Sequence, residues 1–157
     1  MKNKRMSMTN KYGKFAAMTA TSTVVMFGLM YLNTYRLDHL YFSETRAYMA
    51  VVMGATMAGI MLGFMLNMYN NRKTNISIFV GSILVFVLSL WLVRSQVTVG
   101  DVAWMKAMIP HHSIAILTSE RANISDPRVR QLADEIIAAQ VREIAEMKVL
   151  IKDLESR

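Results

Sequence analysis

Two adjacent histidines, His111 and His112, form the one cluster of this chain in which groups capable of chemistry converge. The thioethers of Met105 and Met108 and the carboxylate of Asp101 precede them within about three helical turns. Thioether and imidazole groups are ligands for soft or borderline metals, Cu(I) in particular. The cluster therefore predicts a candidate copper site.

A helix over residues 99–122 is expected to carry this cluster, with an interruption or kink at Pro110, because proline cannot donate to the carbonyl of Lys106. At about 100° per residue, Met105, Met108 and His112 share one stripe. His111 points about a quarter-turn away, so it needs the kink or a second chain to join the same site.

A second helix is expected from Pro127 to about Leu154, with Asp126 as its N-cap. Gln140 and Glu143 interrupt the apolar stripe by which this helix is expected to pack, and buried polar groups need hydrogen-bond partners. A hairpin of the two helices would supply a partner by bringing His112 towards these two residues. The stripe consists of Leu132, Ile136, Gln140, Glu143, Met147, Ile151 and Leu154.

A structural interpretation of the same residues stays open. Histidine beside Glu and Gln can form a hydrogen-bond network, and methionines at helical spacing often only fill a core. No spacing matches a zinc signature such as H-E-x-x-H. Because the chain has neither a nucleophile beside a base nor a phosphate loop, we do not expect an enzyme. The absence of cysteine excludes disulfides and thiolate metal sites.

The remainder of the chain predicts a membrane anchor. Three apolar segments, at about 15–33, 47–69 and 76–93, have lengths near those needed to cross a bilayer. The expected fold is all-α, with a basic lead over 1–14, a three-helix transmembrane region over 15–96 and a soluble helical hairpin over 97–157. The lead carries Lys2, Lys4, Arg5, Lys11 and Lys14.

The charge distribution predicts the orientation. Residues 1–96 hold 10 Lys and Arg against 2 Asp and Glu, whereas residues 97–157 hold 8 against 9. The basic excess in the membrane half argues against nucleic-acid binding. The lead and the loop with Arg72 and Lys73 are expected in the cytoplasm. The hairpin is then periplasmic or extracellular, on a bacterial inner or cell membrane.

Two further features leave alternatives open. The second apolar segment is rich in methionine, which either conducts metal or only packs the helices. His39, beside Asp38, is interpreted as an interfacial polar residue rather than a ligand. The methionines are Met49, Met53, Met57, Met61, Met65 and Met68.

A hairpin of about 55 residues buries little core alone, whereas two hairpins make a four-helix bundle. We therefore expect a homo-oligomer assembled through the hairpin, with the site possible between chains. The membrane bilayer is the other expected partner.

The run from Met108 to His112 and the run from Pro127 to Met147 resemble the family known as domain of unknown function 305. The resemblance covers about residues 100–155 and implies a ferritin-like helical bundle. Some members are periplasmic copper or silver binders that use Met and His. The copper-binding members often have extra methionines just after the histidines, where this chain has residues 113–118. The carried-over candidates are Met105, Met108, His111, His112 and Met147, with Gln140 and Glu143 lining the site.

Together these observations predict an integral membrane protein that presents a helical domain outside the cytoplasm. The domain is expected to bind copper or a related metal through Met and His, in metal buffering, sensing or homeostasis. The alternative is a structural or interaction module whose His, Gln and Glu side chains form a hydrogen-bond network without metal.

Overall fold

The computed structural model describes residues 2–157, with side chains from Lys11 onward. The expected all-α class is confirmed, since five α-helices and two short 3-10 turns make up the secondary structure of these residues. The chain divides into two compact units. The first contains residues 1–29 and 46–96, and the second contains residues 30–45 and 97–157.

In the first unit, the expected basic lead and first apolar segment form one helix, α1 (Lys2–Leu29). The lead side chains of Lys2, Lys4 and Arg5 lie outside the described residues. Within α1 the apolar part runs only from Phe15 to Leu29, which is shorter than the about 17–25 residues of a typical span.

Two helices of the first unit, α2 (Glu44–Phe64) and α3 (Arg72–Ser95), are long and apolar enough to cross a membrane by length and composition. A 3-10 turn, η2 (Leu66–Met68), lies between them. Three such helices were expected, and the described residues contain two, because α1 ends early and includes the polar lead. Only 6% of the most apolar stretch of α3 is buried, so α3 is not a covered core helix of this unit.

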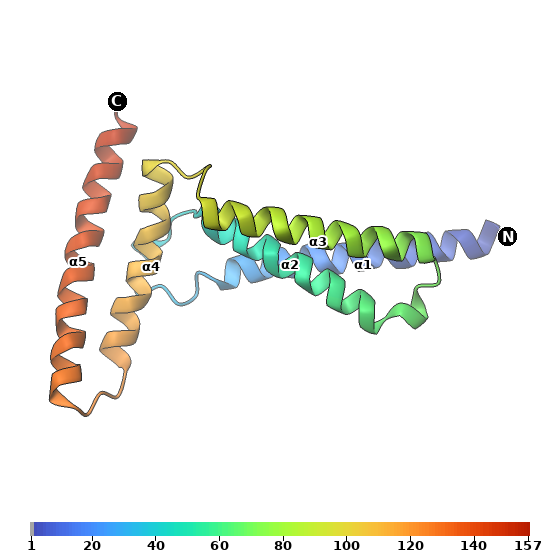
Figure 1. Cartoon of the computed structure of the whole chain (residues 1–157). Helices are drawn as coiled ribbons and strands as arrows, with labels where there is room; N and C mark the ends of the chain where they lie inside the picture. The colour runs from blue at the N-terminus through green and yellow to red at the C-terminus, as the bar shows by residue number, and fades with distance from the viewer. Residues whose placement is uncertain (1) are drawn as a thin grey trace. The chain divides into compact units, whose positions relative to one another are not determined.

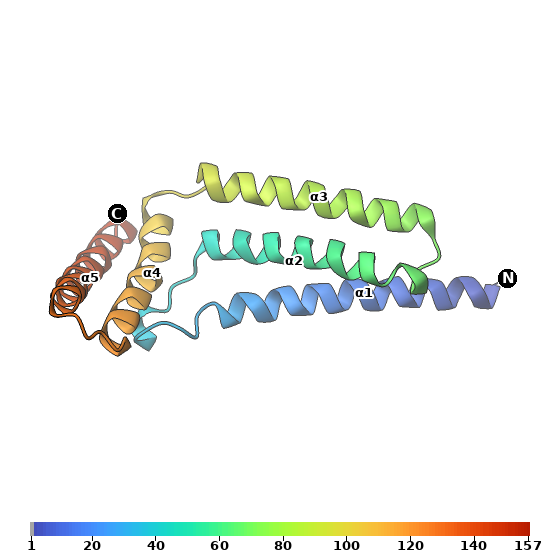
Figure 2. The same cartoon turned by 60° about the horizontal axis from the view of Figure 1, so that its bottom comes forward.

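The helix α1 lies beside α2 in the opposite direction (Figures 1 and 2). Halfway along α1, Phe15 packs against Leu62 and Tyr69. Further along α1, Thr23 faces Gly54 of α2. A Cβ atom at residue 54 would overlap the Thr23 side chain. Glycine at residue 54 therefore permits the close approach of the two helices.

A polar network joins α1 to the end of the unit where α2 gives way to α3. The Tyr12 hydroxyl donates to Asn75 Oδ1 at 2.6 Å. The buried Asn75 amide donates to the Tyr69 carbonyl, also at 2.6 Å. The Tyr12 and Tyr69 rings lie 5.0 Å apart, centroid to centroid. These contacts satisfy a buried amide that would otherwise be costly.

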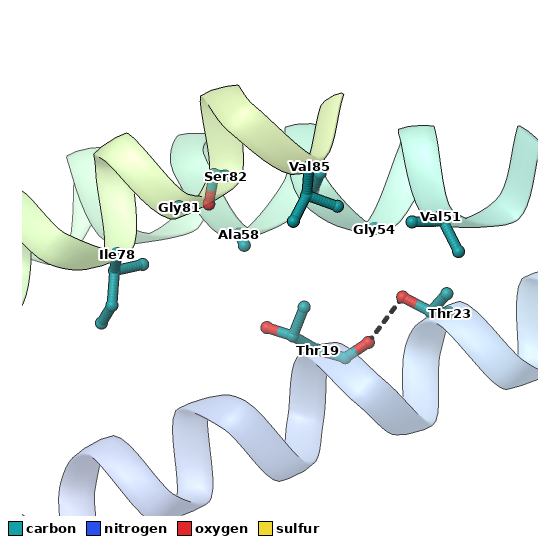
Figure 3. A pocket seen from close by; sticks show the side chains of 10 residues that line it. Thr19, Thr23, Val51, Gly54, Ala58, Ile78, Gly81, Ser82 and Val85 are labelled. Atoms are coloured by element: carbon teal, nitrogen blue, oxygen red, sulfur yellow. Dashed lines mark hydrogen bonds between the residues drawn. The ribbon is translucent and has the colours of Figure 1, made fainter. Parts of the chain in front are cut away.

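A cavity of about 340 Å³ lies between α1, α2 and α3 (Figure 3). Thr23 Oγ1 donates to the Thr19 carbonyl at 2.9 Å, while Thr19 Oγ1 is buried without a hydrogen-bond partner among the described residues. The lining contains small and β-branched side chains and none of the α2 methionines: Thr19, Thr23, Val51, Gly54, Ala55, Ala58, Ile78, Gly81, Ser82 and Val85.

The second unit is built on the expected hairpin of α4 (Asp101–Arg121) and α5 (Pro127–Glu155). The N-cap prediction is confirmed, since Asp126 Oδ1 accepts from the Arg128 backbone N–H at 2.8 Å, and Pro127 is the first helical residue. Of the interruption or kink expected at Pro110, the interruption is wrong. The helix continues through this fully buried proline, because proline removes only its own backbone donor and the neighbouring residues keep their helical bonds.

The contact stripe of α5 matches the predicted one in part. Met147 and Ile151 were expected in the core and are buried there. Leu132, Ile136 and Leu154 were also expected there, but they are 55%, 36% and 37% exposed. The core joins three side chains of each helix at spacings of three, four and seven residues, as in helices packed in pairs. These are Met105, Ile109 and Ile116 of α4 with Ile144, Met147 and Ile151 of α5.

The connection between α1 and α2 completes the second unit. It contains the turn η1 (Leu37–His39), and its Tyr41 packs against the α4–α5 core. His39 and Ser43 are buried. We call residues 30–45 the clasp, because they cover one side of the hairpin.

Candidate metal site and the clasp

The predicted pairing of His112 with α5 is confirmed. Antiparallel packing of α4 and α5 places His112 Nδ1 3.1 Å from Glu143 Oε2. The side chains are 20% and 41% exposed, respectively. The contact lacks the alignment of a hydrogen bond, so Nδ1 is a buried polar atom with no hydrogen-bond partner in the described part of the chain. Such an atom is expected to be satisfied by water, an ion or another chain.

The surroundings of His112 favour its neutral form. Burial lowers the pKa of His112 from 6.5, Glu143 opposes that shift, and the nearby His111 adds to it. A neutral imidazole has a free lone pair, which is the form that binds metals. The geometry therefore provides one available nitrogen beside one carboxylate.

The other predicted ligands are distributed around this pair. Met105 and Met147 lie in the hydrophobic core, and Met108 packs against its edge. Gln140 is half-buried on α5, on the helix that carries Glu143. The three thioethers therefore lie in or against the core of the hairpin whose helix α4 carries His112.

The structure does not bring His111 into the same pair. Its side chain is exposed, and its ring lies 6.1 Å from that of His112, centroid to centroid. Among the described residues, no group of three or more His, Asp or Glu side chains is placed to hold a metal ion. A complete ligand set then requires the thioethers of this chain, or ligand groups from another molecule.

A second histidine site was missed by the sequence analysis. His39 was interpreted as an interfacial polar residue, but it is 6% exposed and lies against α4. Its Nδ1 is 3.0 Å from Ser113 Oγ. The Ser113 oxygen also accepts the Tyr35 backbone N–H at 2.8 Å. Ser113 is fully buried, so one hydroxyl fixes two points of the clasp to the hairpin.

An ion pair adds a contact between the clasp and α5. Lys148 Nζ donates to Asp38 Oδ2 at 2.7 Å, which lowers the pKa of the Asp38 carboxyl. Burial and the Lys148 charge both lower the pKa of His39 from 6.5, against the opposing effect of Asp38. At the end of α4, the Tyr35 hydroxyl donates to Glu120 at 3.2 Å. The clasp is thus held to both helices of the hairpin.

Ser113, His39 and Asp38 contain the residue types of a hydrolytic triad, but their arrangement is not suited to catalysis. His39 Nε2 is 4.0 Å from Asp38 Oδ2, and Ser113 has no exposed surface. A nucleophile must reach its substrate. The group therefore positions the clasp.

The one signal in the sequence that could have indicated this contact is weak. Ser113 follows the two histidines on a helix whose neighbouring positions are apolar, so its hydroxyl needs a partner if that side is buried. The partner lies 74 residues earlier in the chain.

Comparison with known proteins supports the resemblance found in the sequence. Residues 92–156 match the family described as Domain of unknown function (DUF305). An uncharacterized protein of Acanthamoeba polyphaga mimivirus is 33% identical over 101 residues, which cover 60% of this chain and 66% of that protein, just under two thirds of its length. No solved structure matches the chain. Residues 92–156, the segment that includes α4 and α5, are thus similar to the DUF305 family.

Proposed function

We propose that this protein is membrane-anchored and binds Cu(I) or a related soft metal through its hairpin, in metal buffering, sensing or homeostasis. The observation that carries the proposal is the His112–Glu143 pair, in which a buried imidazole nitrogen lies beside a carboxylate and has no hydrogen-bond partner in the described structure. The proposal includes no catalytic role.

Thioethers supply the preference for Cu(I). Met105 and Met147 lie in the core of the hairpin that carries His112, and Met108 packs against that core. His111 and Gln140 lie next to this group and complete the proposed set of lining residues. Because no cysteine is present, histidine and methionine are the soft and borderline ligands that the chain offers.

The membrane anchor is proposed as three crossings. The helices α2 and α3 meet the length and composition requirement. Although α1 is less apolar, it packs along α2 from Tyr12 and Phe15 near Tyr69 to Thr23 at Gly54. These contacts are the reason that we propose a crossing of α1 beside α2.

The orientation follows from charge and connectivity. The Tyr12 end of α1 and the α2–α3 turn lie at one end of the first unit, and both carry basic residues, including Arg72 and Lys73. The positive-inside tendency places that end in the cytoplasm. The clasp and the hairpin are then periplasmic or extracellular.

Contacts within the second unit support the same topology. The clasp precedes α2 and the hairpin follows α3, so two crossings return the chain to the side it left. Residues 30–45 and 97–157 form one compact unit, which requires them to be on the same side. The His39–Ser113 contact is part of that unit.

The competing function is a structural or interaction module without metal. The His112–Glu143 contact supports this alternative, because a polar contact between α4 and α5 also fixes their register. The two functions differ in what the Nδ1 atom binds.

A Cu(I) titration of the full chain in detergent micelles, against a competing chromophoric chelator, tests the proposal. We expect saturable uptake, weakened on the order of 100-fold or more in His112→Ala and by a smaller factor in Glu143→Gln, because both remove a group at the site. Glu135→Gln is the matched control, since Glu135 is an exposed carboxylate elsewhere on α5. Absence of uptake by a folded chain would leave the structural module.

A further inference from the structure

The hairpin has two sides that can be distinguished by residue position. On α4 and α5, the core positions include Met105, Ile109, Ile144 and Met147. Because the helices are antiparallel, residues that follow core positions on each helix lie on one side, and residues that precede them lie on the other. Lys148 follows Met147 and contacts the clasp, which identifies the covered side.

The clasp covers part of the covered side. Ser113 is fully buried under His39 and Tyr35, and Pro110, one turn earlier, has no exposed surface. This side of the hairpin therefore has its packing partner within the same chain.

The opposite side, which we call the open face, has apolar side chains without such a cover. Trp104 on α4 is 51% exposed, and Leu132, Ile136 and Leu150 on α5 are 55%, 36% and 44% exposed. Their spacing is that of residues buried between packed helices. An apolar face of this kind, with a polar centre, marks an interaction site.

The polar centre of the open face contains His111 and Glu143, with His112 between them and the core. Imidazoles lie on one helix and a carboxylate on the other, at the same level of the hairpin. A two-fold rotation about an axis parallel to the helices packs α4 of one copy on α5 of the second copy. It brings the imidazoles of one copy towards the carboxylate of the second copy. The face is therefore complementary to itself in charge as well as in apolar character.

We propose that the open face binds a second copy of this chain and that each copy contributes His111, His112 and Glu143 to one shared metal site. The metal part rests on the proposed function, whereas the pairing of the faces does not. One chain alone lacks three converging His, Asp or Glu groups in its described part. Four-helix bundles commonly build their metal sites from side chains of facing helices.

A membrane surface is the less favoured occupant. Residues 97–157 hold 8 basic and 9 acidic side chains, so the hairpin has no basic excess to attract anionic lipid. Glu143 lies within the face and would be repelled by such lipid.

Cross-linking reports on the face directly, because the chain has no cysteine. Ala139 precedes the core position Gln140 and lies on the open side, whereas Ala145 is exposed and follows Ile144. In detergent micelles with a short bismaleimide, we expect Ala139→Cys to form at least about tenfold more cross-linked dimer than Ala145→Cys. Equal yields, or none from Ala139→Cys, would overturn the proposed pairing even if other parts of the chain associate.

A charge-insertion pair connects pairing to metal. Ile136→Lys places a charge on the open face, and Val141→Lys places one at an exposed β-branched residue outside it. We expect Ile136→Lys alone to abolish the Ala139→Cys cross-link and to weaken Cu(I) binding at least tenfold. Cross-linking without copper uptake would overturn the metal function and retain the pairing. Copper uptake at one ion per chain, unaffected by Ile136→Lys, would overturn the shared site and retain the metal function.

Discussion

His39 and His112 lie in the same compact unit, and burial lowers the pKa of both, yet their surroundings differ. His39 is nearly inaccessible, and its Nδ1 is 3.0 Å from the Ser113 hydroxyl. His112 is partly exposed, and its Nδ1 has a carboxylate nearby but no hydrogen bond. The difference teaches that burial alone does not identify a ligand. A candidate ligand also needs an unsatisfied nitrogen that a metal can reach.

The largest expected effect is a difference in stability between the alanine variants of the two histidines. His39→Ala leaves a cavity and removes one of the two partners of the Ser113 hydroxyl, and should lower the free energy of opening of the hairpin by about 2–4 kcal/mol. His112→Ala should change it by less than about 1 kcal/mol, because its Nδ1 has no hydrogen bond within the described residues. Amide hydrogen exchange along α4 and α5 measures both. Equal losses would break the comparison.

A cap substitution gives a reference scale that involves neither histidine. Asp126→Ala removes the acceptor of the Arg128 backbone N–H and should cost about 1 kcal/mol. The same exchange measurement should find the loss greatest in the first turns of α5, with Cu(I) affinity unchanged. A change in metal affinity would mean that the site responds to general loosening of the hairpin.

The pH dependence of stability sharpens the comparison further. Both histidines have a folded-state pKa below 6.5, so the unfolded chain takes up protons first as the pH falls below 6.5. The stabilisation is complete above pH 6.5 and decreases until the pH reaches the folded-state values. Lys148→Met removes a charge that lowers the pKa of His39, so the decrease should become shallower. Amide exchange corrected for its intrinsic pH dependence tests this.

The smallest expected effect concerns Glu143. This carboxylate opposes the lowering of the His112 pKa, so Glu143→Gln should lower that pKa further and leave the pKa of His39 unchanged. Proton chemical shifts of the two rings, followed against pH in the full chain, distinguish the outcomes. A higher His112 pKa in the variant would contradict the assigned pairing.

Local signals predicted much of the hairpin. Asp126 and Pro127 indicated the start of α5, and the polar Glu143 on a packed helix indicated a partner on α4. The exact contact stripe of α5 was not predicted, because Leu132 and Ile136 are as apolar as the residues that are buried. Apolar character cannot distinguish an intramolecular face from an open one.

The clasp could not be predicted from local pattern. His39 and Ser113 are 74 residues apart, and neither belongs to a motif that implies the other. Likewise, hydropathy places α1 below the level of a spanning helix, whereas its packing against α2 depends on single contacts such as Thr23 with Gly54. Such contacts are decided by the tertiary structure.

The clasp also has a consequence for the order in which the protein is made. Its residues leave the ribosome before α2, but their packing partners on α4 and α5 are synthesised after α3. During that interval His39 and Tyr41 have no core to cover. The second unit can therefore be completed only after the helical pair between its two pieces has been synthesised, and a fragment that begins at residue 97 would lack one wall of its own fold.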